Sequence, residues 1–191
     1  MRLFAVFAIV SSCVSVFGQA LPATNKGMAT GLSGRRAPSF SLPDSSLRQY
    51  DILDYRGKWL LINFIATLPA NCSHCREVTA KLDALKQKYP DRLTILNIVQ
   101  SPPENQGTVA KYIADTKTTS AVVFDLSGVS MAYFKATPQN SSFDTPHIFA
   151  VNPQGMIVRD WNQAQAMEAI MTPDIEKLMG GGAAKPVTKA K

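Results

Sequence analysis

Cysteine is scarce in this chain, with three residues among 191. Cys13 lies in an apolar N-terminal segment, so Cys72 and Cys75 are the only thiols in the rest of the sequence. They can pair only with each other or with a thiol of another molecule. The sequence also lacks a second CxxC and an HxxxH motif. A zinc site built from two such halves is therefore not expected.

An excess of basic residues is missing from the central part of the chain. The formal net charge is +6, but residues 37–181 contain 13 Lys and Arg against 14 Asp and Glu. The surplus lies near the two ends, where we expect solvated, unfolded chain. No basic face is predicted, so nucleic acid is not an expected partner.

No apolar run is long enough to predict a membrane span. The beginning of the chain instead resembles an export signal: Arg2 gives a positive start, Leu3–Phe17 is largely apolar, and residues 18–20 are suited to cleavage. We therefore interpret residues 1–20 as a signal peptide. The tetrapeptide at 10–13 also resembles a lipoprotein processing box, which leaves a lipid anchor on Cys13 as an alternative. Both interpretations predict an extracytoplasmic, periplasmic protein.

The remaining sequence is expected to form one domain between two flexible ends. Residues 21–36 predict a linker, and residues 180–191 predict a disordered Gly/Ala/Lys tail. Residues 37–179 alternate short apolar runs with amphipathic segments, which predicts an α/β fold with a central mixed sheet flanked by helices. Expected strands are Ala37–Leu42, Leu47–Leu53, Trp59–Ala66, Leu93–Val99, Ala121–Phe124, His147–Val151 and Met156–Trp161, the first two forming an extra N-terminal hairpin. The first expected helix begins at Cys72 and stops at Pro90. Apolar residues predict further helices around Val109–Ile113 and Val129–Tyr133, and a helical face formed by Met167, Ile170 and Met171. A terminal helix is expected after an N-cap at Thr172, with Pro173 at the first helical position.

The two cysteines lie where the apolar strand Trp59–Ala66 meets an amphipathic helix. Unpaired N–H groups and the positive end of the helix dipole lower the pKa of a thiol at such a junction. A disulfide that closes so short a loop restrains the unfolded chain little, so stability explains the pair poorly. We therefore interpret Cys72 as a redox nucleophile and Cys75 as the resolving cysteine.

This order of elements and several motifs resemble the thioredoxin fold, and within it the extracytoplasmic TlpA/ResA-type thiol–disulfide oxidoreductases related to the AhpC/TSA peroxiredoxins. Residues 37–42 are similar to the family's opening APxFxL, residues 56–67 to its GKxxLxNFWAT, and residues 145–155 to its TPxxFxID-x-x-G. The resemblance covers residues 37–178. It implies that Pro146 is a cis-proline beside the CxxC, and that Thr145 and Pro146 present backbone to an incoming substrate chain.

The turn that leads into the cysteines departs from the family pattern. Leu68-Pro69-Ala70-Asn71 lengthens it by three residues, and Ile65 replaces the usual Trp. Asn63 stands where cytosolic thioredoxins carry a buried Asp. The group that handles protons during exchange is therefore not identified by the resemblance.

The spacer and the following helix also differ from the family pattern. The family often has Glu three residues beyond the second cysteine, where this chain has Val78, with Glu77 one residue earlier. One residue turns about 100° around a helix, so Glu77 cannot simply inherit that role. His74 lies between the cysteines and can stabilise a neighbouring thiolate, which makes the disulfide more oxidising. We expect His74 and Glu77 to tune the redox pair.

Together these features predict an exported thiol–disulfide oxidoreductase that uses Cys72-Ser73-His74-Cys75 to exchange disulfides with protein substrates. We expect protein disulfide or dithiol substrates, an upstream membrane or envelope redox partner, a monomer, and neither a cofactor nor a metal. A peroxiredoxin-like peroxidase is an alternative, although Pro69 and Ile65 replace the Thr and Pro of the usual PxxxTxxC motif. A Sco-like copper module is less favoured, because the chain has two histidines and a CxxC rather than a CxxxC.

Overall fold

The structure is a computed structural model that describes residues 33–137, 139 and 144–180. The predicted signal peptide, Cys13, most of the predicted linker and almost all of the predicted tail lie outside these residues. The predicted domain, with the two cysteines and Pro146, lies largely within the described residues.

Six strands in the described residues form the central sheet: β1 (Arg35–Arg36), β4 (Trp59–Ile65), β5 (Leu93–Gln100), β6 (Ala121–Asp125), β7 (His147–Val151) and β8 (Met156–Trp161). Their order is β1-β8-β7-β4-β5-β6. β4, β5 and β6 run parallel, whereas β7 is antiparallel to β4 and to β8. This arrangement confirms the predicted mixed sheet.

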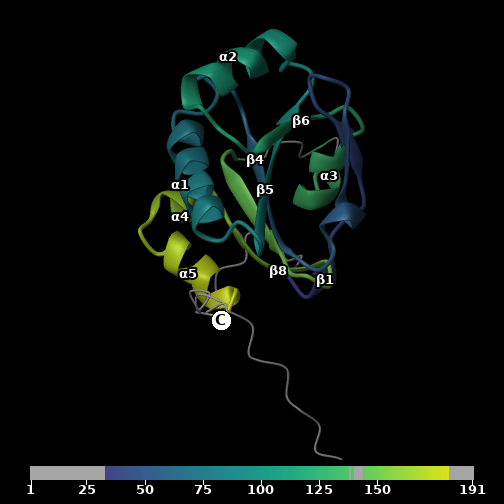
Figure 1. Cartoon of the computed structure of the whole chain (residues 1–191). Helices are drawn as coiled ribbons and strands as arrows, with labels where there is room; N and C mark the ends of the chain where they lie inside the picture. The colour runs from purple at the N-terminus through teal and green to yellow at the C-terminus, as the bar shows by residue number, and fades with distance from the viewer. Residues whose placement is uncertain (1–32, 138, 140–143, 181–191) are drawn as a thin grey trace, which may run out of the picture.

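Helices cover both faces of the sheet: α1 (Cys75–Lys88), α2 (Gln106–Thr116), α3 (Val129–Phe134), α4 (Gln163–Met167) and α5 (Met171–Leu178). Figure 1 shows α1, α4 and α5 on one face of the sheet and α3 on the other. α2 packs beside α1. The predicted N-terminal hairpin is present as β2 (Ser41–Pro43) and β3 (Gln49–Asp51), followed by a short 3-10 helix, Ile52–Tyr55, and it covers the α3 face.

Strand β4 divides its side chains between the two faces, because successive residues of a strand point to opposite sides. Leu60, Ile62 and Phe64 join the core beneath α3 and the hairpin. Leu61 packs with α1, α4 and α5, and Ile65 packs with the cysteines and α2. Burial on both faces explains why β4 and β5 are almost continuous apolar runs. The same alternation turns Asn63, between Leu61 and Ile65, toward α1.

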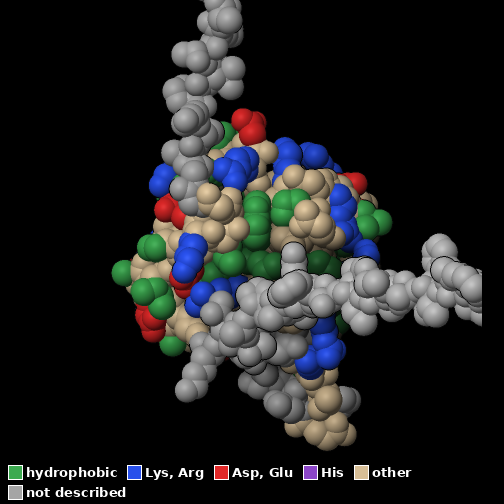
Figure 2. Space-filling view, turned by 90° about the horizontal axis from the view of Figure 1, so that it is seen from below, with side chains coloured by type: hydrophobic (Ala, Val, Ile, Leu, Met, Phe, Trp, Pro, Cys, Tyr) green, Lys and Arg blue, Asp and Glu red, His purple; other side chains and the backbone are tan. Residues whose placement is uncertain are grey.

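Charged side chains are mixed on the surface. Figure 2 shows Lys and Arg side chains interspersed with Asp and Glu on the described surface visible from below. This agrees with the near balance of charge in the central part of the sequence.

Strand β1 corrects the predicted end of the linker. Arg35 and Arg36 pair antiparallel with Ile157 and Met156 of β8. Backbone groups alone make this pairing, with bonds from Gly34 N–H to Ile157 and from Ala37 N–H to Gly155. The two arginine side chains are exposed, so no apolar pattern in the sequence indicates the strand.

The beginning of α1 and the C-terminal helices also differ from the prediction. α1 begins at Cys75 rather than Cys72, with His74 as its N-cap residue. α5 begins at Met171 rather than after an N-cap at Thr172, so Pro173 is the third helical residue. Proline is tolerated there because N–H groups of the first turn have no partner within the helix. Met171 is fully buried, and its packing into the core begins the helix earlier than the Thr-Pro pair suggests.

The expected helical face of Met167, Ile170 and Met171 is not formed. α4 ends at Met167, and Glu168 has extended backbone angles, φ −67° and ψ 152°. Ile170 is 51% exposed, whereas Met171 is buried. Met167 therefore ends one short helix, Met171 begins the next, and Ile170 lies in the break between them as the N-cap residue of α5.

Candidate redox site

Cys72 and Cys75 form a disulfide with each other where the turn after β4 leads into α1, with Cys75 as the first residue of that helix. The sulfur atoms are 2.03 Å apart and the Cα atoms 5.6 Å apart. Cys72 is 5% exposed and Cys75 is fully buried. Both residues are thus buried, and Cys72, the predicted nucleophile, is slightly more exposed than Cys75, the predicted resolving cysteine.

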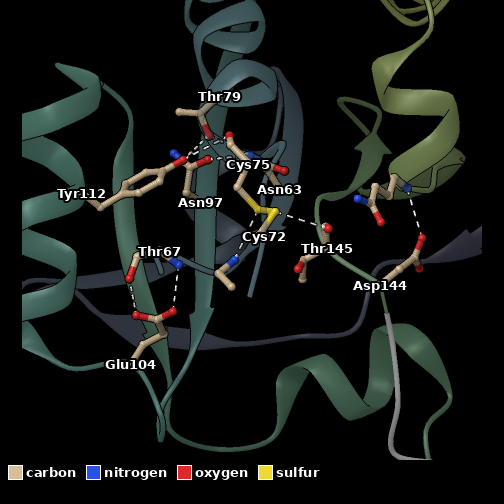
Figure 3. The surroundings of a disulfide bond; sticks show 12 residues. Asn63, Thr67, Cys72, Cys75, Thr79, Asn97, Glu104, Tyr112, Asp144 and Thr145 are labelled. Atoms are coloured by element: carbon tan, nitrogen blue, oxygen red, sulfur yellow. Dashed lines mark hydrogen bonds between the residues drawn. A yellow bond between two sulfur atoms is a disulfide. The ribbon is translucent and has the colours of Figure 1, made fainter. Parts of the chain in front are cut away.

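The loop before β7 brings Thr145 and Pro146 against the disulfide, as the resemblance implies. The Thr145-Pro146 peptide bond is cis, which confirms the prediction for this proline. Cys72 Sγ lies 3.3 Å from the carbonyl oxygen of Thr145, 73 residues further along the chain (Figure 3). A chain bonded to Cys72 would thus meet the backbone of this loop.

Hydrogen bonds hold Cys75 from two sides. The Ala66 N–H group at the end of β4 donates to Cys75 Sγ at 3.4 Å. The Tyr112 hydroxyl on α2 donates to the Cys75 carbonyl oxygen at 3.2 Å. These contacts hold Cys75 between the central strand and the helices α1 and α2.

A buried polar network lies behind the disulfide, between β4, β5, α1 and α2 (Figure 3). Asn63 Nδ2 donates to Asn97 Oδ1 at 2.8 Å and approaches Thr79 Oγ1 at 3.4 Å. Thr79 Oγ1 lies 2.8 Å from the Tyr112 hydroxyl, the group that bonds Cys75. Burial raises the pKa of Tyr112, so its phenol stays neutral. The network contains no carboxylate, because position 63 is occupied by Asn rather than by the buried Asp of cytosolic thioredoxins.

Glu104 is a site residue that the sequence analysis missed. Its side chain is 3% exposed and accepts hydrogen bonds from the Thr67 N–H group at 2.8 Å, from the Thr67 hydroxyl, and from the Thr108 hydroxyl at 2.6 Å. Thr67 follows Ala66, whose N–H group contacts Cys75. Glu104 therefore ties the beginning of the lengthened turn to α2.

One sequence signal could have indicated Glu104. It follows β5, and carboxyl ends of adjacent parallel strands meet at one edge of a sheet, which is where such folds place ligands.

His74 and Glu77 lie where the sequence places them, at the beginning of α1. His74 is half-buried, and its side chain caps no helical N–H group. Glu77 is exposed and forms a salt bridge of 3.0 Å with Lys81, one turn further along the helix. The structure thus directs Glu77 along the helix surface, in agreement with its altered spacing.

His147 anchors the cis-proline loop to the rest of the fold. Its ring is buried in β7, with Nε2 2.9 Å from Asp160 Oδ2 and Nδ1 3.4 Å from Asp144 Oδ1. Asp144 also accepts a hydrogen bond from the Gln163 N–H group at 3.1 Å. These contacts, visible in part in Figure 3, connect the loop to β8 and to the beginning of α4.

No three His, Cys, Asp or Glu side chains of the described residues are arranged to hold a metal ion. None of the helices in this part of the chain has the length and hydropathy needed to cross a membrane.

The chain is similar to known proteins over most of its described residues. The model of the AhpC/TSA family matches residues 33–160. The thioredoxin-like protein YneN of Bacillus subtilis (strain 168) is 30% identical over 101 residues, which is 52% of this chain and 58% of that protein. The chain thus matches less than two thirds of the length of this relative.

Solved structures share the fold. A thiol:disulfide interchange protein from Bacteroides sp. superposes with a TM-score of 0.62 at 23% identity, covering 84% of this chain and 97% of that one. A secreted disulfide oxidoreductase of Mycobacterium tuberculosis superposes with a TM-score of 0.56 at 16% identity, covering 75% and 96%. At these identities the likeness shows the thioredoxin-like fold.

Proposed function

Because the chain belongs to the AhpC/TSA family, we propose that it is an exported thiol–disulfide oxidoreductase that exchanges disulfides with protein substrates. One observation carries the proposal: the Cys72–Cys75 disulfide lies at the end of the central strand, with Cys72 Sγ 3.3 Å from the Thr145 carbonyl oxygen. The descriptions of the similar proteins as thioredoxin-like, thiol:disulfide interchange and secreted proteins support the same function.

Exchange proceeds in two steps that conserve electrons. The Cys72 thiolate attacks one sulfur of a substrate disulfide, and the other substrate sulfur leaves as a thiolate. Cys75 then attacks the Cys72 sulfur of the mixed disulfide, releasing the second substrate thiolate and forming the Cys72–Cys75 disulfide. The substrate gains two electrons that the cysteine pair loses, and the released thiolates take protons according to their pKa values. The reverse sequence oxidises a substrate dithiol.

We propose a role for each residue that neighbours the pair. Thr145 and Pro146 hold the substrate backbone beside Cys72, and His74 and Glu77 adjust the stability of the thiolate. The enclosed Cys75 is reached by the Cys72 sulfur but poorly by bulk thiols, so it acts after the mixed disulfide forms. An upstream membrane or envelope partner restores the starting redox state of the monomer.

A peroxidase function is the second candidate, because the matching family model is that of the AhpC/TSA proteins. In that reaction, peroxide would oxidise Cys72 to a sulfenic acid, which Cys75 would resolve. Pro69 and Ile65 occupy the positions of the usual Thr and Pro, and Ile65 is buried in the apolar core around α2. These two side chains offer no hydroxyl to position a peroxide, so we favour disulfide exchange.

Trapping of the mixed disulfide tests the proposal. Cys75→Ser should leave Cys72 bonded to substrate proteins, since a hydroxyl is too weak a nucleophile to resolve the bond. Non-reducing gels of envelope extracts from the native host should show adducts that disappear with dithiothreitol. The protein within them should begin near Leu21, or carry a lipid on Cys13.

The matched control is Cys72→Ser, which should trap little because Cys75 is enclosed. A peroxidase would instead accumulate sulfenic acid at Cys72 of the Cys75→Ser protein after peroxide treatment. Absence of adducts with both variants would contradict disulfide exchange, and an intact Met1 in cytosolic protein would contradict export.

A further inference from the structure

A pocket of about 230 Å³ opens beside the disulfide, at the edge of the sheet where β4 and β5 end. Its wall includes Asn71, which precedes Cys72, and Thr145, whose carbonyl oxygen contacts Cys72 Sγ. A substrate joined to Cys72 would therefore place the neighbours of its own cysteine within reach of the pocket.

Two buried carboxylates line this pocket, Glu104 and Asp125, each 3% exposed. Within the described residues the Glu104 side chain is bonded only to Thr67 and Thr108, and the Asp125 side chain accepts hydrogen bonds from N–H groups at the beginning of α3, among them that of Ser130 at 2.7 Å. The salt bridges of the described residues include neither carboxylate, and the residues that line the pocket include no Lys or Arg. Their negative charge is thus balanced by hydrogen-bond donors but not by a cation of the described chain.

A third polar group of the pocket is without a partner among the described residues. Ser130 is 1% exposed, and its Oγ makes no hydrogen bond in the described part of the chain. Buried hydroxyl groups are usually hydrogen-bonded, and an unsatisfied one is unfavourable. This orphaned oxygen, on the same wall as Asp125, is suited to accept a hydrogen bond from a bound donor.

We propose that the pocket binds a lysine or arginine side chain next to the reactive cysteine of the substrate polypeptide. This inference rests on the proposed disulfide exchange and specifies which residues next to the substrate cysteine are preferred. Phe64, Ile65 and Ile98 would contact the aliphatic stem, while Glu104 and Asp125 attract the cation. Charges on buried groups are screened less than charges on the surface, so an acidic substrate side chain is disfavoured here.

Peptide disulfides measure this preference directly. Each peptide carries one cysteine joined to 5-thio-2-nitrobenzoate, with Lys or norleucine at position −2, −1, +1 or +2 from the cysteine. The Cys72 thiolate of the reduced protein attacks the peptide sulfur, the nitrobenzoate thiolate leaves with its electron pair, and a Cys72–peptide disulfide forms. A control peptide of identical composition carries the Lys at its far end, which keeps the net charge and moves the cation away from the pocket.

The expected result is a rate constant about tenfold higher for Lys than for norleucine in at least one position, as one charge-assisted hydrogen bond would give. Glu104→Gln keeps the shape of the side chain and removes its charge, so the Lys-to-norleucine ratio should fall toward one. Ser130→Ala should lower the ratio by a smaller factor. Glu168→Gln, at an exposed site outside the pocket, should leave the ratio unchanged.

The outcomes separate this inference from the function on which it rests. If wild-type protein releases nitrobenzoate from all peptides at equal rates, or if the Lys preference persists in both Glu104→Gln and Ser130→Ala, the pocket proposal is wrong while exchange is demonstrated. If wild-type protein releases none, the proposed exchange is contradicted and the pocket proposal falls with it. Should Glu104→Gln fail to fold by circular dichroism, Ser130→Ala decides alone.

Discussion

We propose that His74 helps to set the redox balance of the cysteine pair. It is half-buried, lies directly before the first helical residue, and shares the two-residue spacer with Ser73. An imidazole in this position favours the thiolate and hence the dithiol form, which raises the reduction potential.

Replacing His74 with Ala should therefore make the couple more reducing, by about 30 mV or more, which corresponds to about 1.4 kcal/mol for two electrons. Alanine is preferable to proline here, because His74 has φ −104° and proline would force φ near −65°. Equilibration with glutathione, read by alkylation and mass spectrometry, measures the shift. Ser73→Ala is the matched control. An unchanged or more oxidising potential would show that His74 does not stabilise the thiolate.

The sequence predicts those site residues that belong to short, recognisable motifs. Cys72, Cys75 and Pro146 belong to short motifs, and the structure brings all three together as expected. Glu104 could not be predicted in the same way, because its contact with Thr67 spans 37 residues and depends on how two strand ends meet. A buried carboxylate becomes recognisable only when its hydrogen-bond donors are known.

Elements with buried apolar side chains were predicted well, and those held by backbone contacts were not. β7 and β8 have the predicted bounds because their side chains alternate or run apolar. β1 has no such pattern, since two exposed arginines pair only through their backbone groups. The division of the C-terminal segment into α4 and α5 follows from the burial of Met171 in the core, whereas Met167 is only partly buried. Hydrophobic periodicity alone does not predict this difference.

The burial of Met171 gives a test of how α5 is held. Met171→Ala should lower the free energy of unfolding by about 2–5 kcal/mol, because it removes a fully buried side chain from the core beneath α1. The neighbouring Ile170→Ala should change it by less than about 0.5 kcal/mol, since Ile170 is 51% exposed. Urea unfolding of both variants measures the difference. Equal effects would mean that α5 is not docked through Met171.

For the whole molecule, the fold class followed from the alternation of strands and helices, and the mixed sheet agrees with it. The sequence does not show which elements surround the disulfide at the edge of the sheet. In the structure, β4, α1, the cis-proline loop and Glu104 all lie near this pair of cysteines. Such convergence is expected of a reactive bond rather than of one that only stabilises the domain.

We expect the Cys72–Cys75 disulfide to be redox-active. The mature protein, equilibrated over a series of glutathione ratios and quenched with an alkylating agent, should convert between disulfide and dithiol in one reversible two-electron transition. Its potential should lie above about −300 mV, the range in which disulfides exchange with the glutathione pool. A disulfide that stays closed at every ratio, with a potential well below that value, would mark the bond as structural and contradict the account.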